Sequence, residues 1–147
     1  LGVCHLKNLP ESGPPLPELP RVTAIKRTSL RLRNPANAPD ALEGQALDRI
    51  RTSIEAGSPP PPLLLQRVDY ANGAREWRVY QPVTVGPQCT ACHGPPEEQP
   101  DNLRAVLRER YPTDAAVGYR WGEWRGLIRV TVSDAPAAGE PGSPSKR

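Results

Sequence analysis

The order of hydrophobic and polar residues along the chain predicts four β-strands. Residues 22–33 alternate Thr, Ile, Ser and Leu against Arg and Lys, which favours a first strand with two different faces. Residues 63–71 and 75–85 predict a hairpin, because an Asn-Gly pair stands at the turn between them. Residues 126–132 predict the last strand.

Two helices are predicted between these strands. Asp40 is expected to cap the first helix, with Glu43 completing a capping-box pattern, and Gly57 ends it. Residues 101–110 predict a short polar helix capped by Asp101. Helices interspersed with antiparallel hairpin strands indicate an α+β fold.

The two ends of the chain differ in composition from the part that carries these elements. Residues 9–20 are rich in proline and predict an extended connector. Residues 133–147 are rich in Pro, Gly and Ser, a composition that does not fold by itself. A length of 147 residues suits one domain. We therefore expect a domain over residues 1–132 and a C-terminal tail over residues 133–147.

The composition narrows the possible functions. Phe and Met are absent and 20 residues are proline, so core-forming side chains are scarce and a buried macrocycle would have room. The net charge of +3 comes from basic residues spread along the chain, which speaks against a nucleic-acid surface. No stretch of about 18 apolar residues is present, so no membrane span is predicted.

The sequence Cys89-Thr90-Ala91-Cys92-His93 is a complete CxxCH motif. Two thiols at this spacing can both add to the vinyl groups of one haem, and the adjacent histidine can bind the iron. Zinc is an alternative that needs two further ligands, for which Cys4 and His5 remain. A thioredoxin-like site is another, but it does not need the histidine. The motif predicts one covalently attached haem c in an exported, periplasmic-type compartment.

The second axial ligand of the iron is open on the residues alone. Methionine is excluded, because the chain has none. Cys4, His5, a lysine or no ligand at all remain. Cys4 and His5 are neighbours, so on a helix one of them would face the iron and the other would not. Both could instead lie on a frayed terminus without any role.

Other residues are candidates for the haem pocket. Arg27, Arg31 and Arg33 alternate and would share one face of a strand, where arginines could anchor the haem propionates. The alternative is an ordinary solvated sheet face. Tyr119 is a candidate wall of the pocket, with ordinary core packing as the alternative.

Several stretches beyond the motif resemble a known family. They are residues 27–40, 89–94, 111–119 and 122–126. Together the chain resembles, over about residues 3–132, a family of PAS-like, single-haem c-type domains. This resemblance implies an antiparallel sheet flanked by helices, with the haem held against it. It also implies that the distal iron ligand is a cysteine from an N-terminal helix, which matches Cys4 here rather than His5.

The sequence thus predicts a monohaem c-type cytochrome that transfers electrons, with a redox partner protein or a membrane electron-transport complex. The alternative is a haem-based redox or gas sensor, because family members also occur as sensor regions before histidine kinases. An enzyme is not expected, since no Ser-His-Asp set, phosphate loop or pair of carboxylates suited to acid–base catalysis is present.

Overall fold

The structure is a computed structural model that describes residues 21–134. Its centre is a four-stranded sheet with the strand order β1-β4-β3-β2, in which all neighbours are antiparallel. The strands are β1 (Val22–Thr28), β2 (Leu64–Asp69), β3 (Arg75–Thr84) and β4 (Trp124–Ser133). The predicted α+β class and antiparallel sheet are confirmed.

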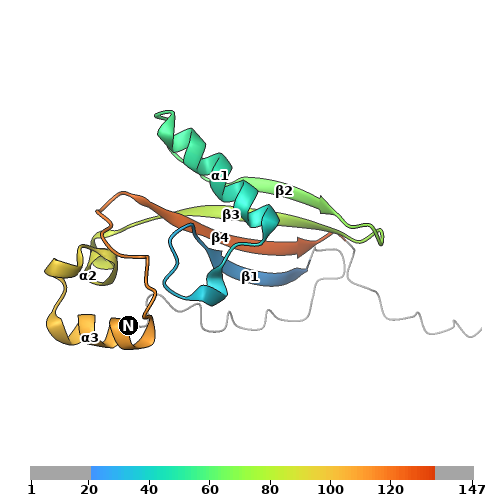
Figure 1. Cartoon of the computed structure of the whole chain (residues 1–147). Coiled ribbons are helices and arrows are strands. Elements are labelled where there is room, and N and C mark those ends of the chain that lie inside the picture. The colour runs from blue at the N-terminus through green and yellow to red at the C-terminus, as the bar shows by residue number, and fades with distance from the viewer. Residues whose placement is uncertain (1–20, 135–147) are drawn as a thin grey trace, which may run out of the picture.

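Three α-helices flank this sheet (Figure 1). They are α1 (Ala41–Glu55), α2 (Thr90–His93) and α3 (Asp101–Arg110), with short 3-10 turns at η2 (Pro35–Asn37), η3 (Pro87–Cys89) and η4 (Pro96–Glu98). Helix α1 lies across one face of the sheet, whereas α2 and α3 lie beyond one end of it (Figure 1). Within the described part of the chain, no helix has the length and apolar composition needed to cross a membrane.

The first strand is shorter than predicted, because β1 ends at Thr28 instead of residue 33. The Ser29 hydroxyl donates to the carbonyl oxygen of Arg125 at 2.7 Å and accepts from the Arg31 backbone N–H at 3.1 Å. The local bond to Arg31 competes with strand pairing, and the bond to Arg125 fixes the chain where it turns away from the sheet. The alternation of polar and apolar residues continues to residue 33, which is why the predicted strand was too long.

The predicted start of α1 is confirmed in detail. The Asp40 carboxylate accepts from the Glu43 backbone N–H at 2.8 Å, and the Glu43 carboxylate accepts from the Asp40 N–H at 2.8 Å. The predicted cap of α3 is wrong. Asp101 is the first residue of that helix, the capping position is Pro100, and no side chain caps it.

The hairpin of β2 and β3 is confirmed. The backbone N–H of Tyr70 donates to the Ala74 carbonyl at 2.9 Å, and Gly73 between them has φ +82°. This left-handed conformation favours glycine and closes a short hairpin loop. The last strand, β4, begins at Trp124, earlier than the predicted residue 126, and ends at Ser133.

The core has two parts. The larger lies between α1 and the sheet and consists of Ala46, Leu47, Ile50, Tyr80 and Leu127. The smaller consists of Val85, Ala116 and Tyr119, against which Cys89 packs. The smaller cluster therefore joins the end of β3 to the CxxCH motif.

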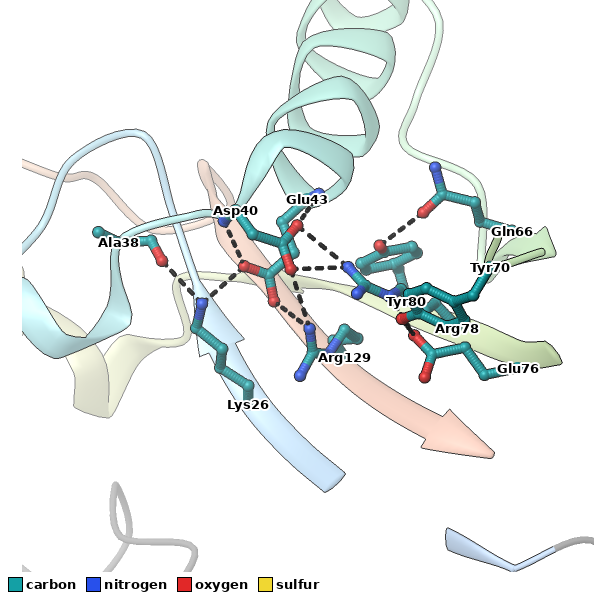
Figure 2. Close-up of polar contacts among 10 residues, drawn as sticks. All are labelled: Lys26, Ala38, Asp40, Glu43, Gln66, Tyr70, Glu76, Arg78, Tyr80 and Arg129. Atoms are coloured by element: carbon teal, nitrogen blue, oxygen red, sulfur yellow. Dashed lines mark hydrogen bonds and ion pairs between the residues drawn. The ribbon is translucent and has the colours of Figure 1, made fainter. Parts of the chain in front are cut away.

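Charged residues also meet under the N-terminal end of α1 (Figure 2). Glu43 is fully buried and forms ion pairs with Lys26 at 2.7 Å and with Arg129 at 2.9 Å. Arg78 reaches Asp40 at 2.8 Å and Glu76 at 2.8 Å. Three carboxylates face three cations in this network, Asp40, Glu43 and Glu76 against Lys26, Arg78 and Arg129. Because the charges balance, the network stabilises the fold without a ligand.

This network makes the stability of the domain sensitive to acid. Burial by itself would raise the pKa of Asp40, but hydrogen bonds from the Glu43 N–H and Arg78 outweigh it and hold that pKa below its ordinary value. The pKa of Glu76 is also lowered: burial is again outweighed, there by bonds from Arg78 and Tyr70. A carboxyl group with a lowered folded-state pKa stabilises the fold above its unfolded pKa and stops doing so as pH falls through the folded value.

We therefore expect the urea midpoint to fall as pH drops from about 5 to about 3, the range of ordinary and lowered carboxyl pKa values. An Asp40→Asn/Glu76→Gln double variant should start from a lower midpoint at pH 7 and lose less over this range. Circular dichroism during urea unfolding measures both midpoints. If the urea midpoints of the two proteins fell equally with pH, the acid sensitivity could not be assigned to Asp40 and Glu76.

Candidate haem site

The CxxCH motif lies on one short helical stretch, where η3 continues into α2, and this stretch carries Cys89, Cys92 and His93. Cys89 and Cys92 are three residues apart on this stretch, so they lie on the same side of it. Both are partly buried and both are free thiols. The local structure thus brings two cysteine sulfurs to one side of the helical stretch, with His93 next to the second.

The backbone of the motif is held by side chains from elsewhere. The Gln99 amide is 6% exposed and donates to the carbonyl oxygens of Cys92 at 3.3 Å and Gly94 at 3.2 Å. The Arg33 guanidinium also donates to the Cys92 carbonyl. A Cβ atom on Gly94 would lie 2.5 Å from the Thr90 carbonyl oxygen, so only glycine fits directly after the histidine. These contacts fix the helical turn that carries the thiols.

His93 is oriented by one hydrogen bond. Its Nδ1 donates to the Ala116 carbonyl oxygen at 2.7 Å, because a carbonyl oxygen only accepts. Nε2 is then the nitrogen with a lone pair for a metal. Burial lowers the pKa of His93; the bond to Ala116 opposes this, and the charges of Arg33 and Arg125 add to the lowering. The imidazole is therefore kept neutral, as metal binding requires.

These residues fit a haem attached at this motif. The thiols can form thioether bonds, and His93 makes the hydrogen bond from Nδ1 to a backbone carbonyl that metal-binding histidines commonly make. Cys89 and Cys92 would hold the macrocycle, and His93 Nε2 would bind the iron. Within residues 21–134 no three His, Cys, Asp or Glu side chains lie close enough together to hold a metal ion. The zinc alternative would need Cys4 and His5, which lie outside the described residues.

The three arginines do not share a strand face, and that prediction is wrong. Arg27 lies in β1, opposite Ile128 of β4, whereas Arg31 and Arg33 follow the end of the strand. The physical reason is the turn at Ser29, which ends the alternation. Propionate binding by these arginines stays a prediction.

Arg31 and Arg33 instead hold the segment that orients His93. Arg31 Nε donates to the Ala115 carbonyl at 3.0 Å, and its Nη2 donates to the Val117 carbonyl. Arg33 Nε forms an ion pair with Asp114 at 2.8 Å. Asp114 in turn accepts from the Ala116 N–H at 2.8 Å. Ala116, whose carbonyl accepts from His93, is thus held through its own N–H and through both of its neighbours in the chain.

The aromatic residues near the motif differ from one another. Tyr119 is 5% exposed and meets the His93 ring edge-on, with ring centroids 6.4 Å apart. Trp124 packs against the larger core, and Trp121 is 74% exposed. Tyr119 is therefore adjacent to the motif and also part of the smaller core cluster, and its role as a wall of the haem pocket stays a prediction.

Sequence reasoning missed Gln99, Asp114 and Arg125. Asp114 and Arg125 lie inside two of the stretches that carry the family resemblance, so the resemblance could have pointed to them. Gln99 lies in a polar segment between prolines and had no such signal. The predicted distal ligand, Cys4, and its rival, His5, lie outside the described residues.

Comparisons with known proteins match the chain to a family model and to a solved haem protein. A family model described as Tll0287-like matches residues 18–133. The chain is also similar to a solved structure, the crystal structure of the cyanobacterial haem protein Tll0287, with 29% sequence identity and a TM-score of 0.60. The match covers 78% of this chain and 63% of that one, so the chain spans less than two thirds of the solved protein. No curated protein matches the chain.

The fold agrees with the family that the sequence resembles. The antiparallel sheet with flanking helices is the PAS-like arrangement expected from the resemblance. The family model covers far more than half of the chain. The chain therefore belongs to the Tll0287-like family of PAS-like, single-haem domains.

Proposed function

We propose that the chain is a monohaem c-type cytochrome that transfers electrons. The observation that carries this proposal is the arrangement of the motif: two free thiols on one helical face beside a histidine whose Nδ1 is already bound. The haem supplies a one-electron change of iron oxidation state when it is bound. Cys89 and Cys92 would attach the haem, and the bond to the Ala116 carbonyl would orient the imidazole of His93. The cluster of Val85, Ala116 and Tyr119 would shield the haem from water.

The proposal includes an exported location, one haem and Cys4 as the distal ligand. With protein ligands on both sides the iron has no open position for a substrate, so the domain would carry electrons and not catalyse. A redox partner protein or a membrane electron-transport complex would receive them. The exposed indole of Trp121, close in sequence to Tyr119, supports such a partner, because tryptophan is enriched in protein interfaces.

Covalent attachment is tested with the full chain produced in a host that matures c-type haem. Haem should stay with the polypeptide through acid–organic extraction, and its pyridine haemochrome should be of the c type. A Cys89→Ser/Cys92→Ser variant should lose the haem on extraction, while Cys4→Ala should keep it. Complete extraction from the unmodified protein would refute the proposal.

The distal ligand is tested by electron paramagnetic resonance. A thiolate from Cys4 should give a low-spin ferric signal that Cys4→Ala changes and His5→Ala leaves alone. The reverse result would establish histidine as the ligand on both sides of the iron.

Binding of carbon monoxide to the ferrous protein distinguishes an electron carrier from a gas sensor. Slow or absent binding fits an electron carrier, whereas rapid binding favours a gas sensor, the alternative that a PAS-like domain suggests.

A further inference from the structure

A cavity of about 710 Å³ opens between the C-terminal end of α1 and the segment that leads into β4. Its apolar wall is made by Leu30, Ile54, Pro59, Pro60, Tyr119 and Trp124. None of the three motif residues lines it, yet Tyr119 contacts the His93 ring on one side and the cavity on the other. Its volume lies in the range of small-molecule sites, about 300–1,000 Å³.

Arg125 places in this wall a cation that has no ion-pair partner among residues 21–134. Its Nη1 donates to the Ser29 hydroxyl at 2.5 Å, and its guanidinium lies 5.2 Å from the centroid of the Tyr119 ring. No carboxylate within residues 21–134 forms an ion pair with it, whereas Arg51 in the same wall pairs with two acidic residues of α1. Burial lowers the pKa of Arg125 and the charges of Arg33 and Arg31 add to this lowering, whereas Tyr119 and the carboxylate of Asp114 oppose it.

A second guanidinium contacts the same Tyr119 ring. Arg31 lies 4.3 Å from the centroid of the same Tyr119 ring and also lines the cavity. Its bonds to two backbone carbonyls fix it there. Two acidic residues, Glu55 and Glu123, line the cavity: Glu55 pairs with Arg51, and the Glu123 carboxylate accepts from the Arg120 backbone N–H. Two cations held at one ring repel each other, and an anion bound by both would offset that cost.

We infer that Arg125 and Arg31 form a carboxylate-binding site at one end of this cavity. The ligand would combine a planar apolar body, which the Tyr119 and Trp124 walls accept, with a carboxylate for the two guanidinium groups. Two sources have this chemistry: a propionate of the haem, which rests on the proposed function, and a free aromatic carboxylic acid. Arg125 takes the role that the sequence pattern had given to an arginine face on the first strand.

The experiment compares the haem-loaded full chain with its Arg125→Gln variant and with Arg51→Gln, a matched control in the same cavity wall. Benzoate is titrated into each protein by calorimetry. Redox difference infrared spectra record the carboxylate bands of the haem, and potentiometry records the reduction potential. Arg125→Lys, which keeps the charge but not the planar fork, replaces Arg125→Gln if that variant does not fold.

A haem propionate at Arg125 should show a shifted carboxylate band and a lowered potential in Arg125→Gln alone, with no benzoate binding in any protein. A free carboxylate site should show saturable benzoate binding that weakens at least tenfold in Arg125→Gln and stays unchanged in Arg51→Gln. Unchanged bands together with no specific benzoate binding would overturn the site. If the unmodified protein carries no covalent haem, the proposed function fails, and the benzoate titration still decides the site.

Discussion

Replacing Glu43 with alanine is expected to lower the free energy of unfolding by about 3–5 kcal/mol, the usual cost of removing one partner from a buried ion pair. Glu43 is fully buried, and its two oxygens face Lys26 and Arg129 while one of them also accepts from the Asp40 N–H. Alanine would remove the ion-pair partner of Lys26, leave Arg129 with only its 3.4 Å contact to Asp40, and break the capping box. A domain of this size has only about 5–15 kcal/mol of stability in total, so the variant should be close to unfolding.

Urea unfolding followed by far-ultraviolet circular dichroism measures this loss. Glu55→Ala is the matched control, because Glu55 lies on the same helix with a side chain 61% exposed and pairs only with Arg51. It should change the stability by well under about 1 kcal/mol. If Glu43→Ala is too unstable to purify, Glu43→Gln retains an acceptor for the Asp40 N–H and should be destabilised less. Similar losses for Glu43→Ala and Glu55→Ala would show that the network does not hold α1 to the sheet.

Replacing Gly126 with alanine should be the second large perturbation, at about 2–5 kcal/mol from backbone strain and forced packing together. Gly126 has φ +151°, and a Cβ atom there would lie 2.4 Å from the Thr28 carbonyl oxygen and 2.9 Å from the Ser29 Cβ atom. Both contacts are with the end of β1, where the chain is packed tightly against β4. The substitution would push these strands apart beside Arg125.

The control for Gly126→Ala is Gly44→Ala in α1, where an added Cβ meets nothing within 4 Å. That change should raise stability by about 0.5–1 kcal/mol, because alanine favours a helix interior more than glycine does. Thermal and urea unfolding of the two variants should therefore move in opposite directions. A neutral Gly126→Ala would mean that β1 and β4 separate easily at this point.

Local chemistry determined the features that the sequence predicted correctly. The CxxCH spacing of Cys89, Cys92 and His93 can be recognised in the sequence without knowledge of the fold, and the covalent haem that it predicts stays a proposal. Asp40 and Glu43 form a capping box over four residues, and the Asn-Gly pair closes a hairpin over a few more. Each of these features involves residues that are close in sequence, so it can be predicted from the sequence without knowledge of the tertiary structure.

Contacts between distant residues were decided only by the tertiary structure. Arg33 reaches Cys92 across 59 positions and Asp114 across 81, and Ser29 reaches Arg125 across 96. The Ser29 contact ended β1 at Thr28 and removed Arg31 and Arg33 from the strand face that alternation had predicted. No local periodicity records which distant carbonyl or hydroxyl will lie opposite a side chain, because that depends on how β1 and β4 pair and where the chain turns. The sequence thus determined the haem-binding motif, and the packing of the strand ends determined which arginines surround it.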